Sequence, residues 1–265
     1  MSDRLLGVPM TVASDIERTL LRRILRGEYE PGTRLPTVRQ LAIEFGTTIP
    51  TIQRTIARLE AQGLIRARQG SGLLVLDPKA NGNINLLSDW FDALWDQPTR
   101  ATDLLDQVLT IRVAISMALV DLMPPPTPEL AVGFSEVMTA EGVEAIRDAD
   151  VRFSQQMLEH AGNFAITILF NTVEHLVRTV DGLAYAFYAD AALHRRTLTA
   201  FLEHSIQHSE ESRKKLHAAL VEWTAAATGR FRAYREMALT ERRAREQPTE
   251  APKKPKKRGG RGARA

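Results

Sequence analysis

Polar and basic side chains are concentrated in one short stretch near the N-terminus, where their chemistry suits a nucleic acid. Guanidinium and hydroxyl groups donate hydrogen bonds to phosphate oxygens, and arginine or glutamine can pair with the edges of bases. The set comprises Gln53, Arg54 and Arg58, with Ile49 and Ala57 as apolar members. We therefore expect these side chains to share an exposed surface that contacts DNA.

Three short helices are predicted to position this set. The first begins at a capping box, Ser14–Glu17, and carries apolar residues at helical spacing as far as Leu25. The second begins at a similar box, Thr37–Gln40, and ends at Gly46. The third is capped by Thr48 and turns inward an apolar face of Ile52, Ile56 and Leu59. Two short helices joined by a tight glycine turn predict a helix-turn-helix.

A β-hairpin is predicted to follow the third helix. Residues 64–68 and 73–76 have the composition of strands, and the glycine-rich segment between them is a turn. Glycines at the tip allow the backbone to approach DNA closely. Contacts with phosphates or the minor groove are expected from Arg66, Arg68 and Gln69. Such a hairpin beside a helix-turn-helix is a wing.

The order of these motifs resembles the DNA-binding domain of the GntR family of regulators. The motifs are Gly32-Thr33-Arg34-Leu35-Pro36, Arg39-Gln40-Leu41-Ala42, Gly46-Thr47-Thr48, Thr51-Ile52, Leu59-Glu60-Ala61-Gln62-Gly63-Leu64-Ile65 and Gly70-Ser71-Gly72. The resemblance implies that Arg39 grips phosphate and guanine. It also implies that Thr48 and Thr51 present hydroxyls at the start of the recognition helix, and that Gly70 forms the tip of the wing.

Two positions depart from the common family pattern. Many members have arginine where this chain has Ile49, and arginine again where it has Gln53. A bidentate contact from arginine to guanine is worth roughly 1–3 kcal/mol of discrimination, so we expect this chain to prefer a different operator. Ile49 could contact a thymine methyl group, and Gln53 could pair with adenine.

Composition and charge narrow the class of protein. The 265 residues include no cysteine, which excludes disulfides, thiolate metal sites and iron–sulfur clusters. We also find no apolar run long enough to span a membrane and no signal peptide, and we expect a cytoplasmic, nucleoid-associated protein.

The charges are unevenly distributed along the chain. Basic and acidic residues number eleven and eight in residues 1–78, seventeen and twenty-four in residues 79–251, and seven and none in residues 252–265. The two ends, rather than the middle, are therefore expected to approach a polyanion. The basic tail either contacts DNA or serves only as a solubilising end.

The rest of the chain is predicted to be helical. The expected fold is mainly α: a winged helix-turn-helix at residues 1–78, a linker at 79–85, an all-α effector-binding and dimerisation bundle at 86–247, and a basic disordered tail at 248–265. The proline run Pro124-Pro125-Pro126 and the pair Gly162-Asn163 are expected to break helices. The predicted helices of the bundle lie near residues 86–95, 100–123, 128–140, 142–161, 164–188, 190–208 and 209–244.

The helical part resembles the ligand-binding domain of the FadR branch of the GntR family. The resemblance is carried by Asp106–Ala118, Asp150-Val151-Arg152-Phe153, Ala161-Gly162-Asn163 and the long last helices. Asn83–Leu87 and Phe187–Asp190 are closer to fatty-acid-responsive members than to metal-binding ones. The resemblance implies an effector site of Arg112, Asp150, Ser154, Phe187, Tyr188 and Tyr234.

The same residues also allow purely structural interpretations. A buried guanidinium requires an anionic partner, so Arg112 either meets an acidic effector, forms an ion pair with Asp150, or lies at the surface. Aromatic residues at helical spacing, such as Phe187 and Tyr188, are often simple core residues.

Metal binding is not expected. Metal-binding relatives place a histidine four residues after the aspartate and two more on later helices, whereas Asp150 is followed by Ser154. His204 lies near the third ligand position, but no histidine falls in Thr224–Thr228, where the fourth would be. We expect His204 and His208 to be solvated surface residues, and we expect no metal and no cofactor.

The sequence therefore predicts a homodimeric transcriptional regulator rather than an enzyme. It is expected to bind double-stranded operator DNA and to respond to a small-molecule effector, with fatty acyl-CoA as first choice and another organic acid as second. An architectural DNA-coating protein is the alternative from another class. We find no phosphate loop, nucleophile elbow or metal triad that would support catalysis.

Replacing Ile49 with arginine should change the base preference of the protein. The new guanidinium would favour guanine at one operator position by about tenfold, because a bidentate pair discriminates by roughly 1–3 kcal/mol. Selection from a randomised operator library, with the wild type in parallel, measures the change. An unchanged base preference would contradict the assignment of Ile49 to the DNA surface.

Overall fold

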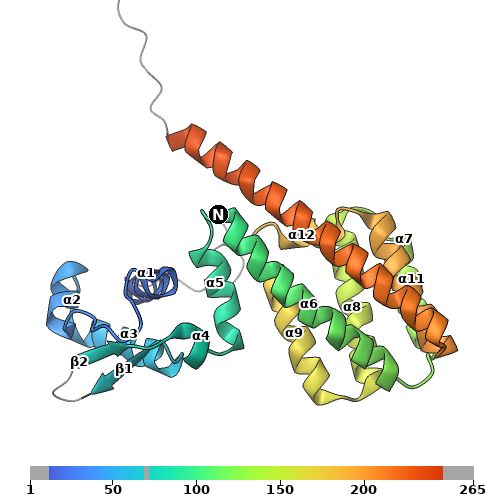
Figure 1. Cartoon of the computed structure of the whole chain (residues 1–265), viewed down its shortest axis with the longest axis horizontal. Coiled ribbons are helices and arrows are strands. Elements are labelled where there is room, and N and C mark those ends of the chain that lie inside the picture. The colour runs from blue at the N-terminus through green and yellow to red at the C-terminus, as the bar shows by residue number, and fades with distance from the viewer. Residues whose placement is uncertain (1–11, 69–71, 247–265) are drawn as a thin grey trace, which may run out of the picture.

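The computed structural model describes residues 12–68 and 72–246, which are mainly helical as predicted. The N-terminal head consists of α1 (Val12–Arg26), α2 (Val38–Glu44), α3 (Ile49–Ala61), β1 (Ile65–Arg68) and β2 (Gly72–Val75). In Figure 1 this head lies to one side of a larger helical body. The tail at 248–265, together with Gln69 and Gly70, lies outside the described residues.

The caps of the three head helices follow the sequence only in part. Thr37 and Gln40 form the predicted capping box of α2. The structure is already helical at Val12, so Ser14 lies inside α1 and its predicted role as N-cap is wrong. Thr48 stands at the N-cap position of α3 but its hydroxyl makes no capping bond. It lies 2.9 Å from the hydroxyl of Thr51 instead, so the two threonines satisfy each other at the start of the helix.

The wing is anchored to the head on one edge by backbone hydrogen bonds. β1 and β2 pair antiparallel with Ile65 opposite Val75. On the edge of β2 that does not face β1, the segment before α2 forms a short β-bridge. In this bridge Leu35 N donates to Leu73 O, and Val75 N donates to Thr33 O. The hairpin is thereby joined to the head, and its buried residues Ile65, Leu73 and Val75 share one hydrophobic core with residues of α1 and α3.

The segment between head and body is ordered and partly helical. It contains α4 (Pro78–Asn81) and a 3₁₀ turn at Ile84–Leu86. Asp77 caps α4 by accepting a hydrogen bond from Lys79 N. A Cβ atom at Gly63 would lie 2.3 Å from the carbonyl oxygen of Asn81, so this glycine allows the segment to pass close to the end of α3.

The body is an all-α bundle. Its helices are α5 (Leu87–Ala93), α6 (Pro98–Leu122), α7 (Pro128–Thr139), α8 (Val143–Ala161), α9 (Phe164–Thr179), α10 (Leu183–Tyr188), α11 (Ala191–Gln207) and α12 (Glu210–Glu246). The single helix predicted for 164–188 is wrong, because the chain breaks between α9 and α10 at Gly182, whose φ is +86°. A Cβ there would collide with the ring of Tyr234. No helix within residues 12–68 and 72–246 has the length and apolarity needed to cross a membrane.

Helix α5 joins the two hydrophobic cores. Phe91 belongs to the core of the body and Ala93 to the core of the head, while Trp90 packs against both. Arg26, at the end of α1, donates to Ala93 O at 2.8 Å and pairs with Asp96 at 2.5 Å. In Figure 1, α5 accordingly lies between α1 and the helices of the body.

A buried arginine on α12 packs at the same contact between head and body, which is called the joint below. The side chain of Arg235 is 1% exposed and lies between the rings of Trp95 and Phe231, at 4.7 and 5.0 Å from their centroids. Phe231 in turn meets Phe91 edge-on at 5.9 Å. Burial lowers the pKa of Arg235 from its ordinary value, which shows that the joint encloses a cation in apolar surroundings.

Replacing Asp89 with asparagine should stabilise the protein at neutral pH. Burial, with help from Asp92 and Glu17, raises the pKa of Asp89 to about 6. Because the folded pKa is above the ordinary value of 3.8, the charged carboxylate opposes folding, fully above about pH 6 and not at all well below pH 3.8. After allowing for solvent screening we expect a gain of about 1 kcal/mol at pH 7.5.

Thermal unfolding of the two proteins across this pH range measures the effect. The difference should shrink as the pH falls towards 3.8, and Asp103→Asn, at an exposed position on α6, should show no such trend. A gain independent of pH would contradict the role given to the carboxylate charge.

Candidate nucleic-acid interface and ligand cavity

Outside α1, which carries the unpartnered Arg22, five exposed arginines of the head have no acidic partner among the described residues. None of them makes a side-chain hydrogen bond or an ion pair with a described residue; they are Arg34, Arg39, Arg54, Arg66 and Arg68. The arginines that hold the head together behave differently, since Arg23 pairs with Glu44 and Arg58 with Glu17. The unpartnered set comes from the segment before α2, from α2, from α3 and from β1. Free guanidinium groups on these elements suit a polyanion.

The first two turns of α3 carry the predicted base-reading side chains. Ile49 is 41% exposed, and Gln53 and Arg54 are exposed as well. Ile49 and Gln53 are four residues apart and share one side of the helix. Thr51 is half-buried, because its hydroxyl turns to Thr48. Among the predicted wing residues, Gln69 and Gly70 lie outside the described residues, while Arg66 and Arg68 project from the same face of β1.

The body holds a cavity with two lobes that meet at four residues. Arg112, Asp150, Ser154 and Phe170 line both lobes. One lobe continues along α9 and α10 and is also lined by Gln155, Val173, Glu174, Val177, Phe187 and Tyr188. The other is also lined by the polar side chains of Ser116, His194 and Thr197 and by apolar ones, among them Leu119, Met157, Leu198, Phe201, Leu220 and Trp223.

Asp150 organises the polar wall of this cavity. Tyr188 donates its hydroxyl hydrogen to Asp150 Oδ2 at 2.9 Å, and His194 Nε2 lies 3.3 Å from Oδ1. Burial alone would raise the pKa of Asp150, but the contacts with His194 and Tyr188 outweigh it and keep the pKa below its usual value. Asp150 is therefore held as a carboxylate in a buried place.

Arg112 is a cation without a hydrogen-bond partner. Its guanidinium lies over the ring of Trp223 at 4.6 Å and near that of Phe187 at 5.9 Å, and it makes no hydrogen bond or ion pair with a described residue. Burial lowers its pKa, and Asp150 acts in the opposite sense. A neighbouring donor, Trp223 Nε1, also lacks a hydrogen-bond partner among the described residues. The cavity thus presents donors that only a ligand or water can satisfy.

Most predicted effector residues meet at this cavity, but Tyr234 does not. Arg112, Asp150 and Ser154 lie where the lobes join, and Phe187 and Tyr188 line the first lobe. The hydroxyl of Tyr234 donates to Asp181, away from both lobes, so its placement in the effector site is corrected.

Two further cavity residues, His194 and Phe170, could not be predicted from the sequence. They come from separate helices, α11 and α9, and each carries no pattern of its own. Only the crossing of these helices with α8 brings them beside Asp150.

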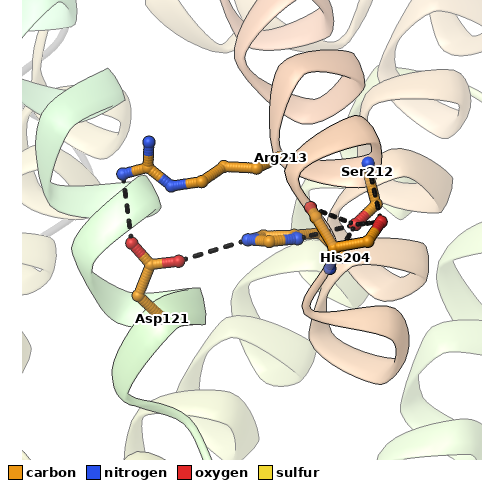
Figure 2. A network of polar contacts seen from close by, with 5 residues as sticks. Asp121, His204, Ser212 and Arg213 are labelled. Atoms are coloured by element: carbon orange, nitrogen blue, oxygen red, sulfur yellow. Dashed lines mark hydrogen bonds and ion pairs between the residues drawn. The ribbon is translucent and has the colours of Figure 1, made fainter.

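A second buried polar network joins the ends of three helices. His204 is 2% exposed, so the expectation that it is solvated is wrong. Its Nδ1 lies 2.9 Å from the Ser212 hydroxyl and its Nε2 lies 3.2 Å from Asp121, which also accepts from Arg213 (Figure 2). The order of aspartate, histidine and serine resembles a hydrolytic triad.

The serine of this network is nevertheless closed to a substrate. Ser212 is 1% exposed and its hydroxyl donates to Ser209 O at the start of α12. The network ties α6 to α11 and α12 and offers no accessible nucleophile. In residues 12–68 and 72–246 there is also no group of three or more side chains placed to hold a metal ion.

The head matches the model of a known protein family. Residues 12–75, from α1 to β2, match the family model described as "Bacterial regulatory proteins, gntR family". The head of this chain is similar to the DNA-binding domain of that family, and a helical C-terminal domain follows it.

The chain is also similar to proteins that are named as regulators. The helix-turn-helix transcriptional regulator Rv0494 of Mycobacterium tuberculosis is 28% identical over 181 residues, which cover 66% of this chain and 72% of the relative. The mannosyl-D-glycerate system repressor MngR of Escherichia coli is 34% identical, over 34% of this chain and 37% of its own length. A solved GntR-family regulator from Pseudomonas syringae covers 87% of this chain and 89% of its own at 16% identity, with a TM-score of 0.44.

Replacing Asp150 with asparagine should destabilise the body in a pH-dependent way. The folded pKa of Asp150 is below its ordinary value, so its charge favours folding above the unfolded pKa, and this contribution is lost as the pH falls through the folded pKa. At pH 7 we expect a loss of about 2 kcal/mol, because Arg112 and His194 would lose their carboxylate neighbour.

Urea unfolding at several pH values tests this. The free energies of unfolding of the two proteins should become equal in acid, where Asp150 is protonated in the wild type too. Equal stability at pH 7 would mean that the cavity wall does not depend on this charge.

Proposed function

We propose that this chain is a GntR-family regulator of the FadR branch, that it binds a specific double-stranded operator as a homodimer, and that a small-molecule effector in the helical body controls it. The observation that carries the DNA-binding part is the set of five exposed arginines without partners among the described residues, on the segment before α2, on α2, on α3 and on β1, together with the exposed side chains in the first turns of α3. Phosphate contacts from such a set supply affinity, and Ile49, Gln53 and Arg54 supply readout of the bases.

Replacing Arg39 with alanine should weaken operator binding by at least about tenfold, as loss of one charged phosphate or guanine contact does. Binding to the upstream promoter region of the protein's own gene, compared with random duplex of equal length, provides the measurement at physiological salt. Arg232→Ala is the matched control, because Arg232 is exposed and unpartnered on α12 in the body. Equal binding of the wild type to both duplexes would overturn the proposal.

The effector is proposed to be an organic acid with an apolar portion. An anionic group would pair with Arg112, which stacks on Trp223 and makes no hydrogen bond or ion pair with a described residue, and the apolar side chains of the second lobe would contact the rest. A fatty acyl group fits this description. Support for this choice comes from Trp223 Nε1, a buried donor without a hydrogen-bond partner among the described residues, whose side chain lines the same cavity.

The charge of the cavity bears on whether the ligand is a CoA thioester. Its lining has one arginine, Arg112, against the carboxylates of Asp150 and Glu174. Several phosphates would find no cations there, so a CoA moiety would have to remain outside while the acyl chain enters. A simple carboxylate needs only Arg112.

Arg112→Gln should abolish stabilisation by the effector. Thermal shift with fatty acids, acyl-CoAs and short organic acids in separate arms distinguishes the candidate ligands. A ligand present at about 100 times its Kd should stabilise the wild type by about 2.7 kcal/mol, and the variant by much less. Tyr234→Phe, outside both lobes, is the control and should respond like the wild type. A ligand that stabilises Arg112→Gln equally would place the effector elsewhere.

An architectural protein that coats DNA is the second candidate function. The exposed arginines of the head would serve it equally well. It would protect DNA continuously in a footprinting experiment, whereas a regulator protects discrete sites. The cavity favours the regulator, since a coating protein has no need of a built ligand site.

A further inference from the structure

One carboxylate stands among the basic elements proposed to face DNA. Glu60, in the last turn of α3, is the single acidic residue between Glu44 and Asp77, and it is exposed. A negative charge close to phosphates lowers affinity. A residue that opposes binding by its charge needs another role to account for its presence at this position.

Glu60 completes a hydrogen bond that the wing cannot make for itself. Leu64 is hydrogen-bonded to the returning strand, because Leu76 N donates to Leu64 O. The backbone groups of successive residues in a strand point alternately to its two edges. The N–H of Ala67, three residues after Leu64, therefore points away from β2. Glu60 Oε1 accepts that N–H at 3.0 Å. The free edge of β1 is therefore tied to the recognition helix by this side chain.

The other side of the same helix end is tied to α1. Arg58 donates to Glu17 at 2.8 Å, two residues before Glu60. The last turns of α3 are thus held on both sides, while its first turns, with Ile49 and Gln53, stay free for DNA.

We propose that Glu60 is a positioning residue that sets the wing at a fixed place relative to the recognition helix. Through Ala67 it holds β1 so that Arg66 and Arg68 reach phosphates or the minor groove while α3 occupies the adjacent major groove. This inference rests on the proposed DNA-binding function.

Two substitutions separate the acceptor from the charge of Glu60. Glu60→Gln keeps an oxygen that accepts the Ala67 N–H and should bind the operator at least as tightly as the wild type. Glu60→Ala removes the acceptor and should weaken binding by roughly tenfold, although a repulsive charge has been lost, because the wing is no longer fixed. Glu30→Ala removes an exposed charge of the same domain that makes no side-chain contact, and controls for net charge. Circular dichroism confirms that each variant is folded.

A double-mutant cycle with Arg68→Ala tests positioning rather than stability. In the wild type and in Glu60→Gln, removing Arg68 should weaken operator binding and reduce the salt dependence by about one phosphate contact. In Glu60→Ala the same removal should change little, because Arg68 is already misplaced.

The outcomes keep this inference apart from the proposed function. Additive effects of Glu60→Ala and Arg68→Ala, or equal weakening by Glu60→Gln and Glu60→Ala, would overturn the positioning role while operator binding stands. A wild type without operator preference would overturn the proposed function and this inference with it.

Discussion

The arrangement of the whole molecule depends on one short helix that is buried from two sides. Successive residues of α5 serve different hydrophobic cores, since Phe91 packs in the body, Ala93 packs in the head, and Trp90 touches both. An amphipathic helix normally exposes one face; α5 instead gives its second face to the head. Because the contact of Arg26 with Ala93 and Asp96 adds polar bonds to this packing, the head is docked rather than tethered.

The same joint connects the cavity with the head through aromatic contacts. Trp223, which stacks on Arg112, and Phe231, which meets Phe91, lie on the same helix, α12. A ligand that moves α12 would therefore act on the surroundings of Phe91, where Arg235 is enclosed by two rings. An effector can shift the head only if it binds the two arrangements with different affinity. The buried, unpaired Arg235 is a group whose energy would differ between such arrangements.

The sequence was sufficient where local rules decide the structure. The box at Thr37 and Gln40, the glycine turn before α3 and the inward Ile52 follow from caps and periodicity, and most of the predicted bundle helices follow in the same way. Prediction from the sequence failed where contacts between residues distant in the chain determine the structure. The break at Gly182 depends on the ring of Tyr234, and the burial of His204 depends on Asp121 and Ser212. Arg112 and Asp150 could be placed in a site by resemblance, but His194 could not, because a lone histidine carries no periodic signal.

Docking of the head has a geometric consequence for a two-headed assembly. When each head is fixed on its own body by α5 and Arg26, the distance between the two recognition helices is set by how the bodies meet. Such a molecule would accept only a fixed spacing between half-sites, such as one helical turn. Inserting a few base pairs would rotate one half-site to a face of the duplex that the second head cannot reach. A flexibly tethered pair of heads would tolerate that insertion.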